Sequence, residues 1–434
     1  MDKFVIRGGN PLVGTVRVSG AKNSALPCMA AAILTEDEIT LENLPHVRDI
    51  NTERKLLSSM GAEIWVDDTK PDRVKICCRT LSDPVAKYEI VKTMRASSLV
   101  LGPLIARAGV ARVAMPGGCA IGGRPIDLHI RGLEKMGAVI TQEHGYLEAR
   151  VERLLGAHLV FDKITVTGTE DLLMAAVLAE GETLMENCAR EPEVADLAAL
   201  LIAMGAKIEG AGTSTMRVQG VSSLHGARYR INPDRIEAGT FLIAGAITGG
   251  DLTVADCNPA HMSAVINKLQ EAGARVDVFG TDAVRVRGGG QLRAADISTE
   301  EYPGFPTDMQ AQYMALATQA EGVSLVEENI FENRFMHVQE LARMGANIKV
   351  EGRTATVRGP AKLSAAAVMC SDLRASASLV LAALVADGES ILDRVYHMDR
   401  GYERIEEKLA GVGAQIYRMG NVFPTREDEK TAIE

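Results

Sequence analysis

The sequence predicts an α/β protein made of six repeats that pack as two groups of three. The first observation is a short signature, Gly-Ala followed by one residue and then Ile or Val, which stands after apolar helical stretches. The second observation is a set of helical stretches made almost wholly of small apolar residues. The signature recurs about every 70 residues, and self-similarity at a fixed period indicates a repeat architecture. Its six copies begin at Gly61, Gly137, Gly205, Gly273, Gly345 and Gly413.

Each signature glycine is expected to end a helix and to lead into a strand. Before Gly137, for example, Ile126, Ile130 and Leu133 stand at helical spacing. A glycine just past a helix end adopts the left-handed conformation at little cost. The Ile or Val beyond it then begins the strand.

The second helix of each repeat is expected to be buried, because it is apolar nearly all round. Each repeat then comprises strand, helix, strand, helix, strand and strand. A polar stretch at 228–233 separates the third repeat from the fourth. Two groups of three would leave a cleft between them, and such clefts commonly bind ligands. The buried helices are expected at 24–34, 171–178, 239–247 and 376–386.

Composition excludes several classes of protein. The chain has 434 residues, a net charge of −10 and seven cysteines. Sparse cysteines in an odd number do not fit a disulfide scaffold, and a nucleic-acid binder usually carries a basic field. The sequence contains no C-x-x-C pair, so structural zinc is not expected. Neither a signal peptide nor an apolar run of about 20 residues is present, so we expect a cytoplasmic protein that does not engage a membrane.

Basic residues stand at the start of three buried helices. They are Lys22, Arg95 and Arg374, each followed closely by serine. A helix N-terminus with an added cation forms an anion site, and arginine can bind phosphate or carboxylate through two nitrogens. Such sites would overcome the repulsion that a net negative chain exerts on anionic substrates. The alternative is that serine caps the helix and the cation lies on the surface.

A glycine-rich loop at 116–125 holds one cysteine, Cys119, five residues before Arg124. A nearby cation lowers the pKa of a thiol and makes it reactive. The alternative is a small residue of no chemical role in a turn. Other cysteines, such as Cys28 and Cys370, stand in apolar or strand-like stretches and are expected to be packing residues.

The segment 302–310 contains two prolines and then Asp308 at the expected start of a helix. Asp308 could accept a proton from a substrate hydroxyl. The alternative is that it caps the helix.

Six longer segments carry a resemblance to a known family: 22–27, 116–129, 303–310, 331–335, 372–376 and 399–403. On these residues the chain resembles the UDP-N-acetylglucosamine 1-carboxyvinyltransferases, the enolpyruvyl transferases that begin bacterial peptidoglycan synthesis. The resemblance covers nearly all of residues 1–418. It implies a two-domain inside-out α/β barrel with three repeats in each domain. Residues 22–231 would form one domain, residues 1–21 and 232–434 the other, and the active site would lie in the cleft between them. A polar tail would follow at 420–434.

The resemblance also implies the reaction. Phosphoenolpyruvate and UDP-N-acetylglucosamine would give the 3-O-enolpyruvyl ether and phosphate, with no metal, no other cofactor and no obligate protein partner. Cys119 would act as general acid toward the methylene carbon, would be able to form a phospholactoyl adduct, and would be alkylated by fosfomycin. Asp308 would assist deprotonation of the sugar 3-hydroxyl. The residues implied to hold phosphoenolpyruvate are Lys22, Asn23, Arg124 and Arg400, and Lys22 and Arg400 would share the catalytic work.

A further set of positions matches the nucleotide-sugar site of the family. These are Arg95, Arg124, Pro125, Ile126, Asp127, Leu128, Lys163, Ile164, Thr165, Val166, Asp308 and Ile330. Arg334, Asp372 and Arg374 match residues that line the family's cleft.

Two other functions remain open at the level of sequence. A 5-enolpyruvylshikimate-3-phosphate synthase shares the fold and the donor but lacks the Cys119 loop. A non-catalytic paralogue that only binds the nucleotide sugar would not need to retain Lys22, Cys119, Arg124, Asp308 and Arg400 together.

Overall fold

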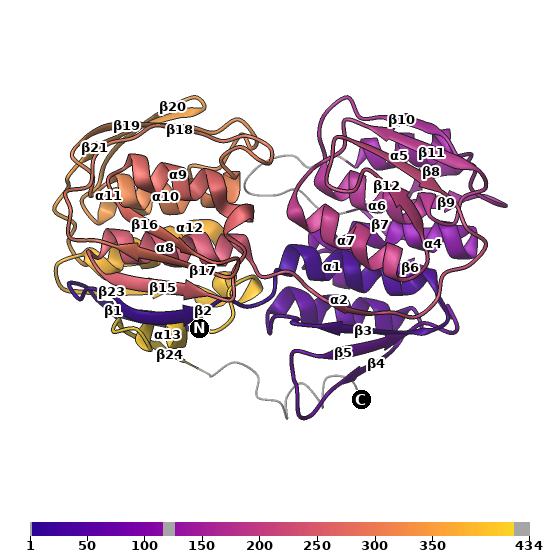
Figure 1. Ribbon diagram of the computed structural model, residues 1–434, viewed down its shortest axis with the longest axis horizontal. Helices are drawn as coiled ribbons and strands as arrows, with labels where there is room; N and C mark the ends of the chain where they lie inside the picture. Colours follow the sequence, from indigo (N-terminus) through magenta and orange to yellow (C-terminus); the bar gives the residue numbers. More distant parts are fainter. Residues whose placement is uncertain (1, 116–125, 421–434) are drawn as a thin grey trace. The chain divides into compact units, whose positions relative to one another are not determined.

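The computed structural model describes residues 2–115 and 126–420, which form two compact units. The first unit contains residues 20–115 and 126–232, and the second contains residues 2–19 and 233–420. The chain therefore starts in the second unit, runs through the first and returns to the second (Figure 1). Each unit is described by itself below.

The first unit contains three repeats and a final strand. Its elements are α1 (Lys22–Ala30), a 3-10 helix (Ala31–Leu34), β3 (Glu38–Glu42), α2 (Arg48–Ser59), β4 (Glu63–Val66), β5 (Val74–Cys77), β6 (Val85–Ala86), α3 (Tyr88–Val91), η2 (Arg95–Val100), α4 (Leu101–Ala108), β7 (Val110–Ala114), α5 (Asp127–Lys135), β8 (Val139–Glu143), β9 (Tyr146–Arg150), β10 (His158–Val160), α6 (Val166–Ala176), β11 (Glu182–Glu186), α7 (Pro192–Ala203), β12 (Lys207–Glu209), β13 (Thr215–Gln219) and β14 (Arg228–Arg230).

The second unit contains the two N-terminal strands and the other three repeats. Its elements are β1 (Lys3–Arg7), β2 (Val13–Arg17), α8 (Arg235–Ile247), β15 (Asp251–Ala255), η3 (Pro259–Met262), α9 (Ser263–Glu271), β16 (Arg275–Phe279), β17 (Ala283–Arg287), β18 (Ile297–Ser298), η4 (Thr307–Met309), α10 (Gln310–Ala317), β19 (Gly322–Glu327), α11 (His337–Arg343), β20 (Asn347–Glu351), β21 (Thr354–Gly359), β22 (Ala367–Met369), α12 (Leu373–Val385), β23 (Glu389–Asp393), η5 (Val395–Arg400), α13 (Ile405–Ala410) and β24 (Gln415–Met419).

The described strands form six four-stranded sheets, one for each predicted repeat. In the sheet β6-β7-β9-β8, the first two strands are parallel and the other pairs are antiparallel. The remaining sheets keep this order. The α/β class and the sixfold repeat predicted from the sequence are confirmed, and so is the order of elements within a repeat.

Three sheets take a strand from a distant part of the chain, which the sequence analysis did not anticipate. The strand β14 pairs with β3, β2 pairs with β15, and β1 inserts between β23 and β24. The strands β14 and β2 take the parallel edge position of their sheets, whereas β1 is a central strand that is antiparallel to both neighbours. In each case pairing needs only an extended segment with the right register, and sequence proximity is not required. The N-terminal strands β1 and β2 thereby complete two sheets of the second unit.

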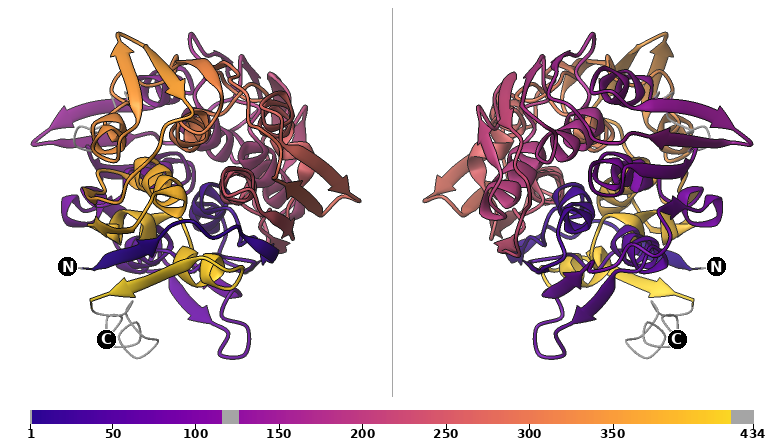
Figure 2. Two further views of the ribbon diagram at one scale, coloured as in Figure 1. Left: turned by 90° about the vertical axis from the view of Figure 1, so that its left-hand side faces the viewer. Right: turned by 90° about the vertical axis from the view of Figure 1, so that its right-hand side faces the viewer.

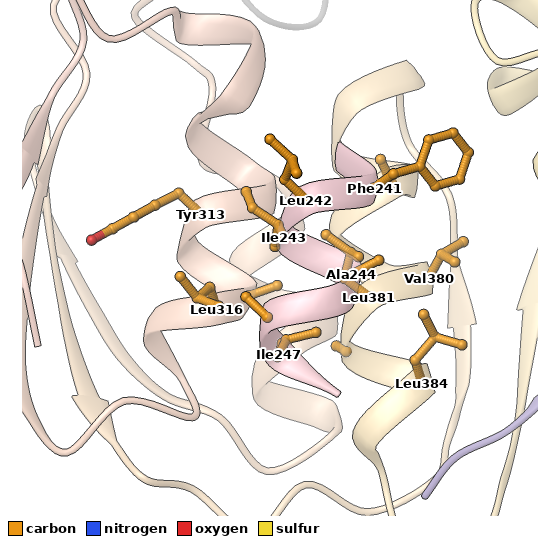
Figure 3. Packing of buried hydrophobic residues seen from close by; sticks show 14 of the residues in the cluster. Phe241, Leu242, Ile243, Ala244, Ile247, Tyr313, Leu316, Val380, Leu381 and Leu384 are labelled. Carbon is orange, nitrogen blue, oxygen red and sulfur yellow. The ribbon is translucent and has the colours of Figure 1, made fainter. Parts of the chain in front are cut away.

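The helices lie inside each unit and the sheets lie outside (Figures 1 and 2). In the second unit α8, α10 and α12 pack against one another, as Figure 3 shows. Leu242 and Ile243 on α8 and Leu379 on α12 are fully buried. Removing each such side chain from water contributes about 1.5–3 kcal/mol. In the first unit α4 packs against α6, and α1 against α7. This arrangement confirms the inside-out barrel.

The buried helices begin earlier than predicted. The helix α12 begins at Leu373, because the carboxylate of Asp372 accepts the backbone N–H groups of Arg374 and Ala375. The helix α8 begins at Arg235, where Asp234 caps it in the same way. The prediction followed the apolar run, whereas the first turn is set by polar capping residues. None of the helices within residues 2–115 and 126–420 combines the length and hydropathy that a membrane span requires.

All six signature glycines have positive φ, as predicted. Their φ values range from 90° at Gly273 to 107° at Gly61. Each follows a helix end, where a left-handed residue lets the chain turn into the next strand.

The variant Gly137→Ala tests this role, because no atom lies within 4 Å of the position a Cβ would take there. The φ of 97° is then the only source of strain, and the substitution should lower the free energy of unfolding by about 1–2 kcal/mol. Thermal and chemical denaturation would measure this. Gly137→Asn is the matched control and should lose less, since asparagine visits the left-handed region more readily. Unchanged unfolding midpoints in both variants would contradict the prediction.

Candidate active site

Several predicted site residues lie outside the part of the chain that the structure describes. These are Cys119, Arg124 and Pro125, together with the tail beyond Gly420. The backbone of Arg95 begins the 3-10 helix η2. The other predicted residues fall into one group in the second unit and two groups in the first.

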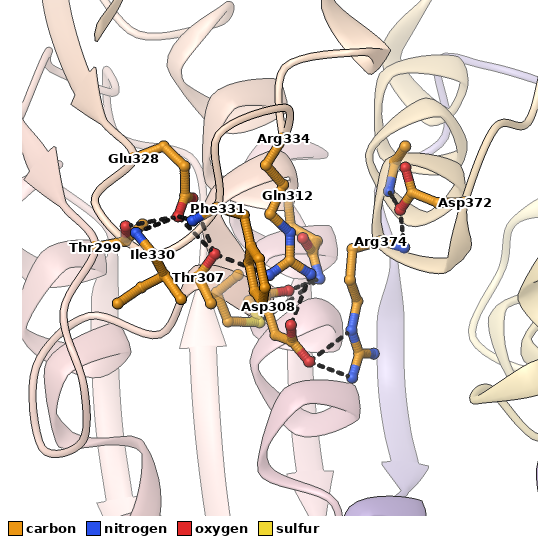
Figure 4. Close-up of polar contacts among 12 residues, drawn as sticks. Thr299, Thr307, Asp308, Gln312, Glu328, Ile330, Phe331, Arg334, Asp372 and Arg374 are labelled. Atoms are coloured by element: carbon orange, nitrogen blue, oxygen red, sulfur yellow. Dashed lines mark hydrogen bonds and ion pairs between the residues drawn. The ribbon is translucent and has the colours of Figure 1, made fainter. Parts of the chain in front are cut away.

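The second unit brings together Asp308, Arg334 and Arg374 (Figure 4). Asp308 lies in η4, Arg334 precedes α11, and Arg374 lies in the first turn of α12. Arg334 donates from Nη2 to Oδ1 of Asp308 at 2.6 Å. Arg374 donates from Nε and Nη2 to Oδ2 of Asp308 at 3.1 and 2.9 Å. Both oxygens of one carboxylate are therefore engaged by guanidinium groups from separate elements.

This ion-pair cluster is largely shielded from water. The exposed fraction of the side chain is 6% for Arg334, 5% for Arg374 and 26% for Asp308. Burial alone would raise the pKa of Asp308, but Arg374 and Arg334 together hold that pKa well below its ordinary value of 3.8. Asp308 is consequently a carboxylate across the physiological range. It does not cap its helix, because Pro306 occupies that position, and Arg374 is not a surface cation.

Asp372 and Arg400 support the same region. The carboxylate of Asp372 caps α12 and so fixes the turn that carries Arg374. Arg400 is half-buried at the end of η5, which packs against α12. The backbone N–H of Ile330 is bound by Glu328, whose carboxylate also accepts the Thr307 hydroxyl.

Glu328 was not found by the sequence analysis, and no motif distinguishes it there. It follows β19 directly and is 1% exposed. In the sequence Glu328 stands two residues before the predicted site residue Ile330, but this position alone does not indicate a function for it. Only the fold reveals that it faces Thr307 and Thr299.

In the first unit Lys22 is the first residue of α1 and pairs with Asp49 of α2. The distance from Nζ to Oδ2 is 3.0 Å, and the two side chains are 12% and 6% exposed. Asn23 follows and is exposed. Asp49 was also missed, because it lies in an ordinary amphipathic helix. Both Lys22 and Arg374 thus stand at helix starts as predicted, and each faces an aspartate.

The second group in the first unit gathers the segments 126–128 and 163–166, because α5 and α6 pack against each other. Asp127 begins α5, and Thr165 caps α6 by accepting the N–H of Gly168. Lys163 is exposed just before α6. Two helix N-termini and a cation in this arrangement favour an anionic ligand. Leu128, Ile164 and Val166 pack against the core beneath.

His129 lies beneath this group and is 2% exposed. Burial lowers the pKa of His129 to about 4, although Asp127 opposes the shift. The imidazole is therefore neutral near pH 7 and adds no positive charge to the group.

Comparison with known proteins defines the class. Residues 6–409 match the model of the family described as EPSP synthase (3-phosphoshikimate 1-carboxyvinyltransferase). The crystal structure of the enolpyruvyl transferase NikO from Streptomyces tendae is similar with a TM-score of 0.86 and 25% identity, over 97% of this chain and 99% of that one. EPSP synthase from Acinetobacter baumannii has the same fold, with a TM-score of 0.74 and 19% identity over 97% of this chain and 100% of that one.

Curated relatives narrow the class further. The UDP-N-acetylglucosamine 1-carboxyvinyltransferase of Acidobacterium capsulatum is 78% identical over 429 residues, which are 99% of this chain and 98% of that protein. The protein of the same name from Koribacter versatilis is 70% identical over 427 residues, 98% of each chain. The chain therefore belongs to the EPSP synthase family and, within it, to the UDP-N-acetylglucosamine 1-carboxyvinyltransferases, a family of transferases that act on small molecules.

The variant Asp308→Asn tests the ion-pair cluster. It leaves Arg334 and Arg374 buried without the counter-charge that both contact directly, which should lower the free energy of unfolding by roughly 3–5 kcal/mol at about pH 7. Because the folded pKa of Asp308 is depressed, its stabilisation is present above the unfolded pKa and is lost as pH falls through the folded one. The deficit of the variant should therefore shrink in strong acid. Chemical denaturation at neutral and acidic pH would measure it.

Asp251→Asn is the matched control for this experiment. Asp251 pairs with Arg285 through two hydrogen bonds of 2.6 Å, but both side chains are more than a third exposed. Solvent screens such a pair, so this variant should lose little stability. Equal losses in the two variants would contradict the importance assigned to the buried cluster.

Proposed function

We propose that this protein transfers the enolpyruvyl group of phosphoenolpyruvate to the 3-hydroxyl of UDP-N-acetylglucosamine and releases phosphate, the first committed step of peptidoglycan synthesis. The observation that carries the proposal is the identity of 78% over 429 residues with a protein named for this activity. The cytoplasmic location inferred from the sequence belongs to the same proposal.

The relatives favour this acceptor over shikimate 3-phosphate. The names of five relatives at 58–78% identity specify UDP-N-acetylglucosamine, whereas two structures of EPSP synthase from Acinetobacter baumannii are 18–19% identical. The Cys119 loop supports the same choice. A non-catalytic paralogue is disfavoured because Lys22, Cys119, Arg124, Asp308 and Arg400 are all present.

In this proposal the site residues divide by substrate. Lys22, Asn23, Arg124 and Arg400 hold the phosphate and carboxylate of phosphoenolpyruvate. The segments 126–128 and 163–166, with Arg95 and Ile330, hold the nucleotide sugar. Support comes from the helix N-termini of α5 and α6, whose partial positive charge suits a diphosphate.

Cys119 and Asp308 carry the proton transfers. Cys119 protonates the methylene carbon of phosphoenolpyruvate, so that the neighbouring carbon becomes electrophilic. The sugar hydroxyl attacks that carbon as Asp308 draws off its proton, which gives a tetrahedral intermediate with a methyl group. The methyl carbon then returns one proton to the Cys119 thiolate as phosphate leaves, so that the C=C bond of the enol ether forms, and the departing phosphate takes up the proton held by Asp308. Fixed charges around a water-excluding site stabilise this movement of charge.

The surroundings of Asp308 set a condition on its role. A carboxylate whose pKa lies well below its ordinary value is a weak base. An anionic substrate that draws Arg334 or Arg374 toward itself raises the pKa of Asp308, because an opposite charge then no longer favours the ionised form. Substrate binding thus prepares the base for its step.

A phosphate-release assay tests the acceptor. With phosphoenolpyruvate as donor, UDP-N-acetylglucosamine should support turnover and shikimate 3-phosphate should not. Turnover with shikimate 3-phosphate alone would assign the protein to the EPSP synthase activity. Absence of turnover with both, together with calorimetric binding of UDP-N-acetylglucosamine, would identify the non-catalytic paralogue.

The variant Cys119→Asp tests the general acid. A carboxyl group can also donate a proton, so turnover should persist, whereas an aspartate at this position should resist alkylation by fosfomycin. Mass spectrometry after incubation with fosfomycin would detect the adduct on the unaltered protein alone. Cys28→Ser is the control and should leave both turnover and alkylation unchanged, since Cys28 is fully buried in α1. Equal inactivation of the Cys119→Asp variant would contradict the assignment.

A further inference from the structure

We propose that Glu328 is a positioning residue for the acceptor side of the active site. This inference rests on the proposed function, because it takes Asp308 as the group that meets the sugar hydroxyl. Glu328 belongs to none of the residue sets implied by the family resemblance. Its carboxylate connects two turns of the second unit, one carrying Asp308 and the other carrying Ile330 (Figure 4).

Four donors surround the carboxylate of Glu328, and all four reach its Oε1. It accepts the hydroxyl of Thr299 at 3.0 Å and the backbone N–H groups of Ile330 and Phe331, each at 3.0 Å. The Thr307 hydroxyl lies 2.9 Å from both carboxylate oxygens. A charged group that is 1% exposed persists in a fold only when it is paired in this way.

A chain of hydrogen bonds runs from Glu328 to Asp308. Nη1 of Arg334 donates to the Thr307 hydroxyl at 2.8 Å, so that this hydroxyl must direct its own proton to Glu328. Nη2 of the same guanidinium donates to Asp308 at 2.6 Å. The plane of Arg334 is thereby fixed at two points, and the position of Oδ1 of Asp308 is fixed with it.

Charge balance supports the same connection. The buried cluster holds two guanidinium groups, Arg334 and Arg374, against the carboxylates of Asp308 and Glu328. Glu328 is linked to Arg334 through the hydroxyl of Thr307. Its negative charge partly offsets the positive charge of Arg334, which would otherwise be balanced by Asp308 alone. Removing its charge therefore tightens the hold of Arg334 on the base.

Glu328 also fixes the turn that follows β19. Its bonds to the N–H groups of Ile330 and Phe331 define where Ile330 lies, and Asn329 N–H donates to Thr299 beside it. One carboxylate thus positions both Asp308, the proposed base, and Ile330, a proposed contact to the nucleotide sugar. The phosphoenolpyruvate residues Lys22 and Asn23 belong to the first unit, whereas Glu328 and its partners belong to the second.

The experiment compares steady-state constants of Glu328→Gln, Thr307→Val and the unaltered protein. Glutamine keeps the shape of the side chain but removes its charge and one acceptor. Valine removes the hydroxyl that relays Glu328 to Arg334. We expect Glu328→Gln to raise the KM for UDP-N-acetylglucosamine about three- to tenfold and to lower kcat about tenfold, while the KM for phosphoenolpyruvate stays within about twofold. Thr307→Val should share the fall in kcat, and the double variant should lose less than the product of the two single effects.

Asp296→Asn is the matched control. Asp296 is an exposed carboxylate beside β18 that binds the backbone N–H of Leu325 and has no link to Asp308. Its loss should leave all three constants unchanged. Thermal unfolding midpoints measured for every variant separate a change in kinetics from a loss of fold.

The outcomes are distinguishable. Equal rises in both KM values, or independent effects of the two single variants, would overturn the positioning role and reduce Glu328 to a structural brace. Unchanged constants in Glu328→Gln would overturn it as well. If the unaltered protein shows no turnover with UDP-N-acetylglucosamine, the proposed function fails first, and the positioning role fails with it. If Glu328→Gln does not fold, Thr307→Val alone still decides, because a normal kcat in that variant contradicts the relay.

Discussion

The pairing of Asp308 with Arg334 and Arg374 is the interaction on which the rest of the second unit's site depends. Two guanidinium groups from separate parts of the unit meet at one carboxylate. Each charge would be costly in this environment by itself, and each is stabilised only because the other two are in place. The elements that carry them are therefore constrained together: η4 by its approach from 302–306, α12 by the Asp372 cap, and the segment before α11 by Thr307. A displacement of any one would leave a buried charge unpaired.

The barrel supplies the rigidity that this pairing requires. Helices α8, α10 and α12 are buried along nearly their whole length, and side chains in such close-packed interiors have little room to move. The start of α12 and the start of α10 are thus held at a fixed separation by apolar packing far from the charges. The first unit repeats the principle, with Lys22 at the start of a buried helix and Asp49 on the next one. In both units the first turn of a buried apolar helix carries a cation beside a carboxylate, and the helix N-terminus favours the negative charge of that carboxylate.

Sequence reasoning reached the repeat and the buried helices, because each leaves a local trace. The six glycines of positive φ report a backbone requirement at one residue, and the cations at helix starts stand beside recognisable apolar runs. It did not reach Glu328, Asp49 or the Thr307 relay. Those contacts join residues 21 to 29 positions apart, and nothing in the intervening residues encodes the meeting. The pairing of β14 with β3 and of β2 with β15 was not predicted for the same reason, because the sequence of a strand does not specify which other strand it pairs with.

The exchange of strands between distant parts of the chain has a consequence for the order of folding during synthesis. All strands of the first unit have been made once residue 232 has left the ribosome, so that unit can close while the remainder is still being translated. The strand β1 of the second unit lies between β23 and β24. It cannot form either pairing until almost the whole chain has been synthesised. Contacts of such long sequence separation form slowly, since the loop must close before the pairing stabilises it. The strand β1 is consequently synthesised before the whole first unit and is among the last strands to find its partners, whereas β2 pairs with β15 much earlier.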